Sequence, residues 1–184
     1  MRVISGSARG LKLSSPSGID TRPTLDRVKE AVFSSILPYI GDAVVLDAFS
    51  GSGALGIEAL SRGARYAVFA DNNKNAVRCI KENICAARVL SFCEVYEGSV
   101  FDFLKTAKKD KMFDIVFLDP PYASGFYTPF LTALNNADIL ADDAIIVAEW
   151  SRDADKPDFT PFFDEIKTKA YGRVCVTILK RGAL

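Results

Sequence analysis

The sequence predicts an α/β protein with a doubly wound, mostly parallel sheet, a C-terminal antiparallel hairpin, and a short N-terminal arm and helix. From residue 43 onward, short apolar runs alternate with segments at helical spacing. The apolar runs are continuous, which is typical of parallel strands buried on both faces. Two β-rich segments around Gly172-Arg173 close the sequence and indicate a hairpin.

The segment before residue 43 is predicted to form an arm followed by a helix. Residues 3–4 and 11–13 are apolar and flank a glycine-containing turn, which indicates a short hairpin or an extended arm. Residues 14–23 are rich in Ser, Pro and Gly, as linkers are. Thr24 is the expected N-cap of a helix whose apolar residues recur at helical spacing until Pro38.

The remaining elements follow from the same alternation of patterns. The strands are expected at residues 43–49, 66–70, 91–96, 113–118, 144–149, 166–171 and 174–179. The helices between them are expected at residues 54–62, 74–88, 100–108 and 128–136. We therefore divide the 184 residues into an N-terminal arm and helix, residues 1–40, and a main domain, residues 41–184.

The charge of the chain is balanced overall but uneven along its length. Lys plus Arg and Asp plus Glu each number 23, which argues against a protein that coats nucleic acid by bulk charge. Residues 1–40 nevertheless hold six basic and three acidic groups, a net charge of +3. A basic face at the N-terminus is therefore expected.

The residues that the chain lacks exclude several kinds of chemistry. Histidine is absent, so no Ser–His or Cys–His nucleophile can form, and the chemistry must either need little proton abstraction or use a carboxylate. The four cysteines contain no C-x-x-C pair, so we expect reduced thiols and no metal site. No apolar run has the length of a signal peptide or a membrane span, and we expect a cytoplasmic protein.

The first candidate site lies between the expected strand at 43–49 and the helix that follows. Open α/β sheets bind ligands at such strand–helix turns, and the glycines of residues 47–53 leave amide groups that can point at a ligand. Residues 51–56 also satisfy G-x-G-x-x-G. Asp71 ends the next strand, where a carboxylate can accept hydrogen bonds from both hydroxyls of a ribose. A nucleoside and a dinucleotide cofactor both fit this pattern.

The second candidate site is Asp119-Pro120-Pro121-Tyr122, after the expected strand at 113–118. Two prolines fix the backbone and remove two amide donors, so the Asp119 carboxylate and nearby carbonyl groups are left as acceptors. Two acceptors that hold the hydrogens of an exocyclic base amine would direct its lone pair at a methyl donor. Tyr122 offers a face on which an extruded base can stack. The motif predicts amine methylation, which requires no histidine.

With these motifs the sequence resembles the Rossmann-like (class I) S-adenosylmethionine-dependent methyltransferases that act on amines. Residues 2–6, 9–10, 22–31 and 54–64 narrow the resemblance to the bacterial 16S ribosomal RNA guanine-N2 methyltransferases. The resemblance covers nearly the whole chain. It implies transfer of a methyl group from S-adenosylmethionine to the N2 amine of a guanine in small-subunit ribosomal RNA. We expect a monomer, and the neutral charge and small size of the chain favour a ribosomal particle over naked RNA as the substrate.

The resemblance also implies roles for individual residues. The catalytic residues would be Asp119, Pro120, Pro121 and Tyr122. The cofactor would be held by Asp47, Phe49, Ser50, Gly51, Gly53, Asp71, Asn72, Ser99 and Val100. RNA phosphates would meet Arg9, Arg22, Thr24, Arg27 and Lys29.

The sequence departs from the family pattern at two places. Members usually carry a tryptophan before the Arg-Gly of the arm, whereas Ser7-Ala8 precede Arg9-Gly10 here. Members also usually end the third strand with Gly-Asp, whose carboxylate contacts the adenine amine, and this chain has Gly98-Ser99. Three alternatives stay open: a DNA adenine amine methyltransferase, a nicotinamide-dependent oxidoreductase, and a non-catalytic cofactor- or RNA-binding scaffold.

Overall fold

A computed structural model describes residues 1–16, 23–107, 112–121, 125–159 and 162–181, with the backbone alone for residues 23–25. Its strands are β1 (Val44–Ala48), β2 (Tyr66–Asp71), β3 (Cys93–Glu97), β4 (Phe113–Leu118), β5 (Leu140–Ser151), β6 (Phe163–Tyr171) and β7 (Val174–Arg181). Its helices are α1 (Pro23–Ser35), α2 (Leu37–Ile40), α3 (Ala54–Ser61), α4 (Lys74–Ala86), α5 (Val100–Thr106) and α6 (Tyr127–Ala137), with a 3-10 turn at Leu90–Phe92.

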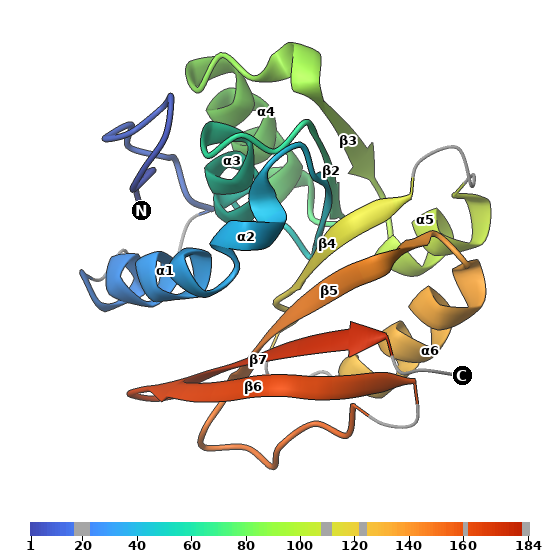
Figure 1. The fold of residues 1–184 in the computed structure, drawn as a ribbon. Helices are drawn as coiled ribbons and strands as arrows, with labels where there is room; N and C mark the ends of the chain where they lie inside the picture. The colour runs from blue at the N-terminus through green and yellow to red at the C-terminus, as the bar shows by residue number, and fades with distance from the viewer. Residues whose placement is uncertain (17–22, 108–111, 122–124, 160–161, 182–184) are drawn as a thin grey trace.

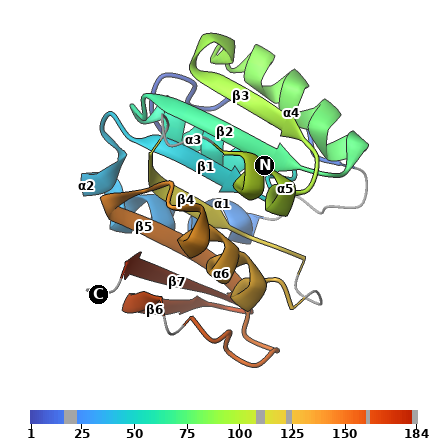
Figure 2. The ribbon, with the colours of Figure 1, turned by 90° about the vertical axis from the view of Figure 1, so that its right-hand side faces the viewer.

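The strands form one sheet in the order β3-β2-β1-β4-β5-β7-β6. Strands β1 to β5 pair in parallel, and β7 is antiparallel to both of its neighbours. Helices α1 to α4 cover one face, and α5 and α6 cover the other (Figures 1 and 2). The doubly wound, mostly parallel sheet with a C-terminal hairpin is therefore confirmed.

Each face of the sheet buries its own apolar core. On the face of α1 to α4, strand residues such as Phe69 and Phe117 pack against helix residues such as Phe33 and Ile57. On the other face, Leu46 and Leu118 pack against Phe130 of α6. Helix α4 begins where the Asn73 side chain caps the backbone amides of its first turn. The sheet is therefore packed on both faces, and the carboxyl ends of its parallel strands lie side by side along one edge of the sheet.

The N-terminal arm folds back on itself and docks on α3. An antiparallel bridge joins Arg2 to Lys12, as the expected hairpin requires. Gly6 has φ of +83°, and a Cβ there would lie 1.7 Å from the carbonyl oxygen of Ser61. The Ser61 hydroxyl donates to the Ser5 carbonyl at 2.6 Å and accepts from the Ala8 amide at 2.9 Å. The arm therefore approaches α3 so closely that only glycine fits at Gly6.

Three boundaries differ from the sequence predictions. Thr24 lies inside α1, which includes Pro23, and is not its N-cap; proline suits a first helical turn because the amide it lacks would have no helical partner. Helix α1 ends at Ser35, and Pro38 sits in the first turn of the separate α2 for the same reason. Strand β5 extends to twelve residues because it pairs with both β4 and β7. Among the described residues, no helix combines the length and apolarity needed to cross a membrane.

Candidate active site

A cavity of about 630 Å³ opens at the carboxyl edge of the sheet. Its floor and one side come from the ends of β1, β2, β4 and β5, where doubly wound sheets bind ligands. The start of the arm and two apolar residues of α1, Val28 and Val32, supply another side. The volume suits a ligand of cofactor size. Asp47, Asp71 and Asp119, which come from three different strands, all line this cavity.

Hydrogen bonds to acceptors on β1, on β2 and within the loop hold the loop between β1 and α3 in place. The Asp47 carboxylate accepts from the Gly56 amide at 2.8 Å, and the Asp71 carboxylate accepts from the Gly51 amide at 2.8 Å. The Ser50 amide donates to the Ala70 carbonyl, and the Gly53 amide donates to the Ser50 carbonyl. The prediction that glycine amides of this loop point at a ligand is thus wrong for Gly51 and Gly53. Their amides hold the loop to β2 and to itself.

Glycine is required in this loop for close packing. Gly53 has φ of +74°, and a Cβ at Gly56 would lie 2.4 Å from the Phe69 ring and 3.1 Å from the Asp47 carboxylate. Phe49 also adopts a positive φ, of +59°. Such conformations cost about 1–3 kcal/mol for a non-glycine residue and are held by the surrounding structure. The G-x-G-x-x-G pattern therefore reflects packing of α3 against β1 and β2.

Aromatic side chains fix Phe49 at the cavity wall. Its ring stacks on Phe126 with centroids 5.6 Å apart and an interplanar angle of 12°. Phe101 and Phe130 contact it at steeper angles, with centroids 6.5 Å and 5.8 Å away. Sequence reasoning identified Phe49 and missed its three partners, which come from α5, α6 and the turn before α6. Offset and tilted aromatic pairs of this kind stabilise a defined ring position.

Four carboxylates line the cavity, and burial together with neighbouring negative charge raises the pKa values of two of them, Asp47 and Asp119. Burial raises the pKa of Asp47 to about 7, with a further contribution from the charge of Asp71, against the lowering effect of the Gly56 amide. Burial also raises the pKa of Asp119 well above its usual range, and the charges of Glu149 and Asp47 add to the effect. The cavity is therefore a site of negative potential that favours protons or another cation.

Glu149 belongs to this site and was missed by sequence reasoning. It follows the buried stretch of β5 and lies one residue beyond the Leu118–Ala148 pair of the β4–β5 ladder. The Tyr127 hydroxyl donates to its backbone carbonyl at 2.6 Å, which holds α6 to this end of β5. The sequence did contain a signal for Glu149: it is an acidic residue that follows an apolar strand segment, as Asp71 and Asp119 do.

The other predicted cofactor residues divide into two groups. Ser50, Gly51, Asp71 and Asn72 line the cavity. Ser99 and Val100 do not. Ser99 caps α5 by accepting from the Phe101 amide at 3.3 Å, and Val100 is buried. Of the second motif, Pro120 and Pro121 line the cavity beside Asp119, whereas Tyr122 lies outside the described residues.

The predicted RNA-binding residues separate in the same way. Arg9 and Arg27 are exposed on the arm and on α1. Arg22 and the Thr24 side chain lie outside the described residues. The prediction for Lys29 is wrong: its side chain is 4% exposed and pairs with the buried Glu58 carboxylate at 3.0 Å. Its ammonium also donates to the Arg2 carbonyl at 2.5 Å, so it is committed to an internal network.

Comparison with known proteins assigns the family. Residues 1–180 match the family described as Conserved hypothetical protein 95. The chain is 39% identical to ribosomal RNA small subunit methyltransferase D of Haemophilus influenzae over 162 residues, covering 88% of this chain and 83% of that protein. It is 34% identical to the protein of the same name from Escherichia coli K12, covering 100% of this chain and 91% of that one. The chain belongs to the family described as Conserved hypothetical protein 95, and these two methyltransferases are its relatives.

The solved structures agree with this assignment. The structure of yhhF from Escherichia coli superposes with a TM-score of 0.85 at 34% identity, covering 100% of this chain and 99% of that one. The fold is that of the class I methyltransferases, as the doubly wound sheet and its antiparallel hairpin predict. The cavity lies at the carboxyl ends of the parallel strands, where doubly wound sheets bind their ligands.

Proposed function

We propose that the chain transfers a methyl group from S-adenosylmethionine to the N2 amine of a guanine in small-subunit (16S) ribosomal RNA. The observation that carries the proposal is the placement of Asp119 and Pro120 beside the loop after β1, inside one acidic cavity. The names of the Haemophilus and Escherichia relatives support the ribosomal RNA substrate. An enzyme with this substrate acts in the cytoplasm.

The charges of the cavity favour this cofactor over a dinucleotide. Its described lining contains Asp47, Asp71, Asp119 and Glu149, and its one described basic residue, Lys29, pairs with Glu58. S-adenosylmethionine carries a sulfonium and an ammonium group, which four carboxylates attract. The pyrophosphate of a nicotinamide cofactor would meet these carboxylates without a free cation or the Gly51 and Gly53 amides to bind it.

We infer how the chain holds the cofactor from the lining of the cavity. Asp71 and Asn72 lie at the end of β2, where a carboxylate and an amide suit the ribose hydroxyls. Asp47, Ser50 and Gly51 lie toward the methionine end, and the ring of Phe49 forms an apolar wall. Ser99 and Val100 contribute indirectly: they begin α5, and Phe101 of that helix contacts Phe49.

The reaction then requires only acceptors from the chain. When bound, S-adenosylmethionine supplies an electrophilic methyl group on a positively charged sulfur. The Asp119 carboxylate and the Pro120 carbonyl accept the two hydrogens of the guanine amine and turn its lone pair toward that methyl group. Bound S-adenosylmethionine would supply the methyl group and leave as an uncharged thioether, and the Asp119 carboxylate or water would take the proton that the methylated amine loses. A nearby positive charge lowers the raised pKa of Asp119, which keeps the carboxylate ionised when it must accept.

We propose that residues 1–40 form the RNA-facing part of the molecule and residues 41–184 the methyltransferase domain. Arg9 of the arm and Arg27 of α1 are exposed, and α1 borders the cavity through Val28 and Val32. Guanidinium groups suit phosphates, and phosphate contacts position a nucleic acid without reading its sequence. We further propose that a monomer acts on a partly assembled small-subunit particle, whose surface adds specificity that a neutral chain cannot supply.

Radiolabelled methyl transfer tests the proposal. Small-subunit particles, naked ribosomal RNA and genomic DNA, each from cells that lack this protein, are incubated with labelled S-adenosylmethionine. We expect label in N2-methylguanine of the RNA. Asp119→Ala should retain cofactor binding and lose about 10²–10³-fold in transfer rate, as when one preorganised electrostatic contact to a transition state is removed. Label in DNA adenine, or an unchanged rate for Asp119→Ala, would contradict the proposal.

A further inference from the structure

The β6–β7 hairpin carries basic residues in the same row of the sheet as the catalytic cavity. Glu149 of β5 pairs with Val176 of β7, and Val176 pairs with Lys169 of β6. Glu149 and Val176 both line the cavity. Neighbouring strands lie about 4.8 Å apart, so the backbone of Lys169 is about 10 Å from that of Glu149.

The side chains of Lys167, Lys169 and Tyr171 share the face on which the cavity opens. Together with Val176 and Ile178 they surround a small recess against Val32 of α1. The Lys169 ammonium lies over the Tyr171 ring, 5.3 Å from its centroid. A cation held on a ring in this way loses less conformational freedom when it binds an anion.

The opposite face of the hairpin holds it in place. The Thr177 hydroxyl, fully buried, accepts from the Trp150 indole at 3.0 Å and lies 2.7 Å from the Thr168 hydroxyl. This row joins β5, β7 and β6 by their side chains as well as by their ladders. The lysine face is therefore presented by a rigid support.

The two lysines differ from their basic neighbours in their partners. Lys156 pairs with Glu165, and Lys180 pairs with Asp143. Within the described part of the chain, neither Lys167 nor Lys169 has a carboxylate within 4.0 Å. The acidic residues of β6, Asp164 and Glu165, lie at the other end of the strand, away from the cavity.

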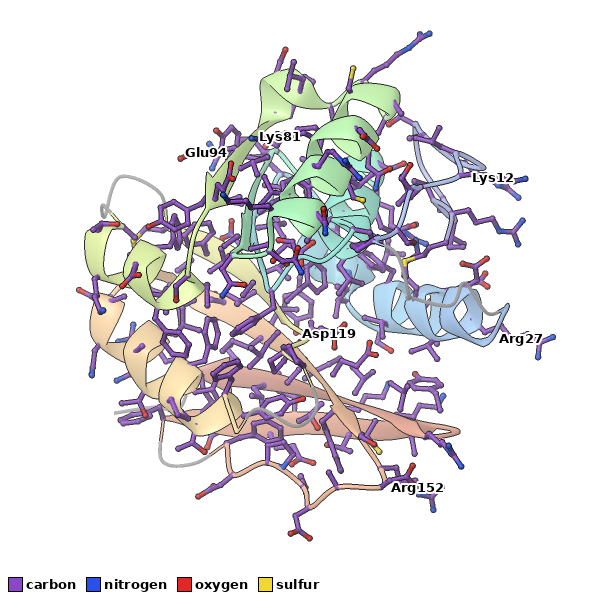
Figure 3. The ribbon with its side chains drawn as sticks, turned by 180° about the vertical axis from the view of Figure 1, so that it is seen from behind. Lys12, Arg27, Lys81, Glu94, Asp119 and Arg152 are labelled. Carbon is purple, nitrogen blue, oxygen red and sulfur yellow. The ribbon has the colours of Figure 1, made fainter. Side chains whose placement is uncertain are left out.

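Two arginines extend this charge to the tip of the hairpin. Arg173 is 88% exposed and its distance of 3.6 Å to Asp153 is long for an ion pair. Arg152 follows β5 and is exposed, and its backbone amide donates to the Arg173 carbonyl. In Figure 3, Arg27 of α1 and Arg152 both lie toward the right of the view, and Asp119 lies nearer the centre, about level with Arg27.

We propose that Lys167 and Lys169, with Arg152 and Arg173 at the hairpin tip, bind phosphates of the RNA strand next to the target guanine. The inference rests on the proposed function and adds a second RNA-binding surface, across the cavity from Arg27. The charge of the surface selects RNA as the occupant, because among the described residues Lys167 and Lys169 have no carboxylate within 4.0 Å. RNA carries one negative charge per nucleotide. The distance of about 10 Å between the backbones of Lys169 and Glu149 corresponds to about three stacked nucleotides at about 3.4 Å each.

The test is the double variant Lys167→Gln, Lys169→Gln, measured with small-subunit particles and with naked ribosomal RNA. We expect about a tenfold rise in KM for RNA, an unchanged Kd for S-adenosylmethionine, and a kcat close to that of the wild type. The slope of log K for RNA against log salt should fall in magnitude by about 1–2, roughly one for each phosphate that the variant no longer binds. Lys81→Gln, Lys105→Gln is the matched control: both side chains are exposed on α4 and α5, and both should be dispensable.

The outcomes separate the inference from the proposed function. If the wild type methylates RNA and the hairpin variant keeps the same KM and the same salt slope, the hairpin surface is wrong while the proposed function stands. If the wild type binds the cofactor and methylates no RNA, the proposed function fails, and the inference fails with it. An equal loss in the control variant would also contradict the inference, because it would show a general effect of charge.

Discussion

Carboxylates are buried in two regions of the molecule, and their surroundings differ. One region surrounds its carboxylate with hydrogen-bond donors, and the other places several carboxylates near one another. Glu58 of α3 is completely buried and accepts from four donors: the Ile4 amide at 2.8 Å, the Ser5 amide at 3.0 Å, Lys29 at 3.0 Å and Arg62 at 2.7 Å. In the cavity, Asp119 meets the charges of Glu149 and Asp47, and burial raises its pKa well above the usual range. One region satisfies its charge within the fold, and the other leaves negative charge for a ligand.

The donors around a buried carboxylate distinguish a structural role from a ligand-binding one. A buried carboxylate with a full set of donors stabilises the folded state only as long as every partner stays. Carboxylates that face one another destabilise the empty protein and are stabilised when a cation enters. Glu58 therefore holds the arm, α1 and α3 together, whereas the carboxylates of the cavity favour the binding of a cation.

The largest effect is expected from Glu58→Gln. The change leaves the Lys29 ammonium buried without its counter-charge and weakens the bonds to the arm. We expect a loss of about 3–5 kcal/mol in the free energy of unfolding, measured by urea denaturation. Glu82→Gln is the control, because Glu82 is exposed and its partner Arg78 lies 3.8 Å away. A loss for Glu58→Gln no larger than that of the control would remove the contrast between the two regions.

The next effect is expected from pH on the empty protein. Asp47 has a pKa of about 7 in the folded state and about 3.8 in the unfolded chain. Its contribution to stability is therefore fully present below about pH 4 and is lost as pH rises to about 7. Urea denaturation of wild type and Asp47→Asn across this range should show a decline that the variant lacks.

Cofactor binding should reverse this trend. A cationic ligand favours the ionised form of Asp47, so the Kd of S-adenosylmethionine should fall by up to about tenfold per pH unit as pH rises toward 7 and then level off. Calorimetric titration at several pH values measures it. A Kd that does not change between pH 5 and pH 8 would show that Asp47 gains no positive partner.

The smallest effect is expected from Asp119→Asn on the stability of the empty protein. The raised pKa means that ionisation of Asp119 costs stability at high pH, and asparagine avoids that cost. We expect the variant to be more stable than the wild type at pH 8, with a difference that becomes smaller as the pH falls. Asp143→Asn should change stability in the other direction, because Lys180 lowers the pKa of Asp143. Lower stability of Asp119→Asn at pH 8 would contradict the comparison.

Sequence reasoning identified the strand-end residues and missed the partners that lie far along the chain. Asp47, Asp71 and Asp119 could be placed together because the carboxyl ends of parallel strands meet at one edge. Lys29 was misassigned because its partner, Glu58, is 29 residues away and belongs to another helix. The aromatic partners of Phe49 were missed for the same reason: Phe101 belongs to α5 and Phe126 to the turn before α6, and both are far from Phe49 in the sequence.

The strand order has a consequence for how the protein is made. Strand β7 lies between β5 and β6, although β6 precedes it in the sequence. During synthesis β6 leaves the ribosome without a partner in the sheet and gains one only when β7 has emerged and inserted beside β5. The strand that carries Lys167 and Lys169 is thus the last to be secured, so an enzyme interrupted before β7 would have its parallel strands and lack the lysine-bearing edge.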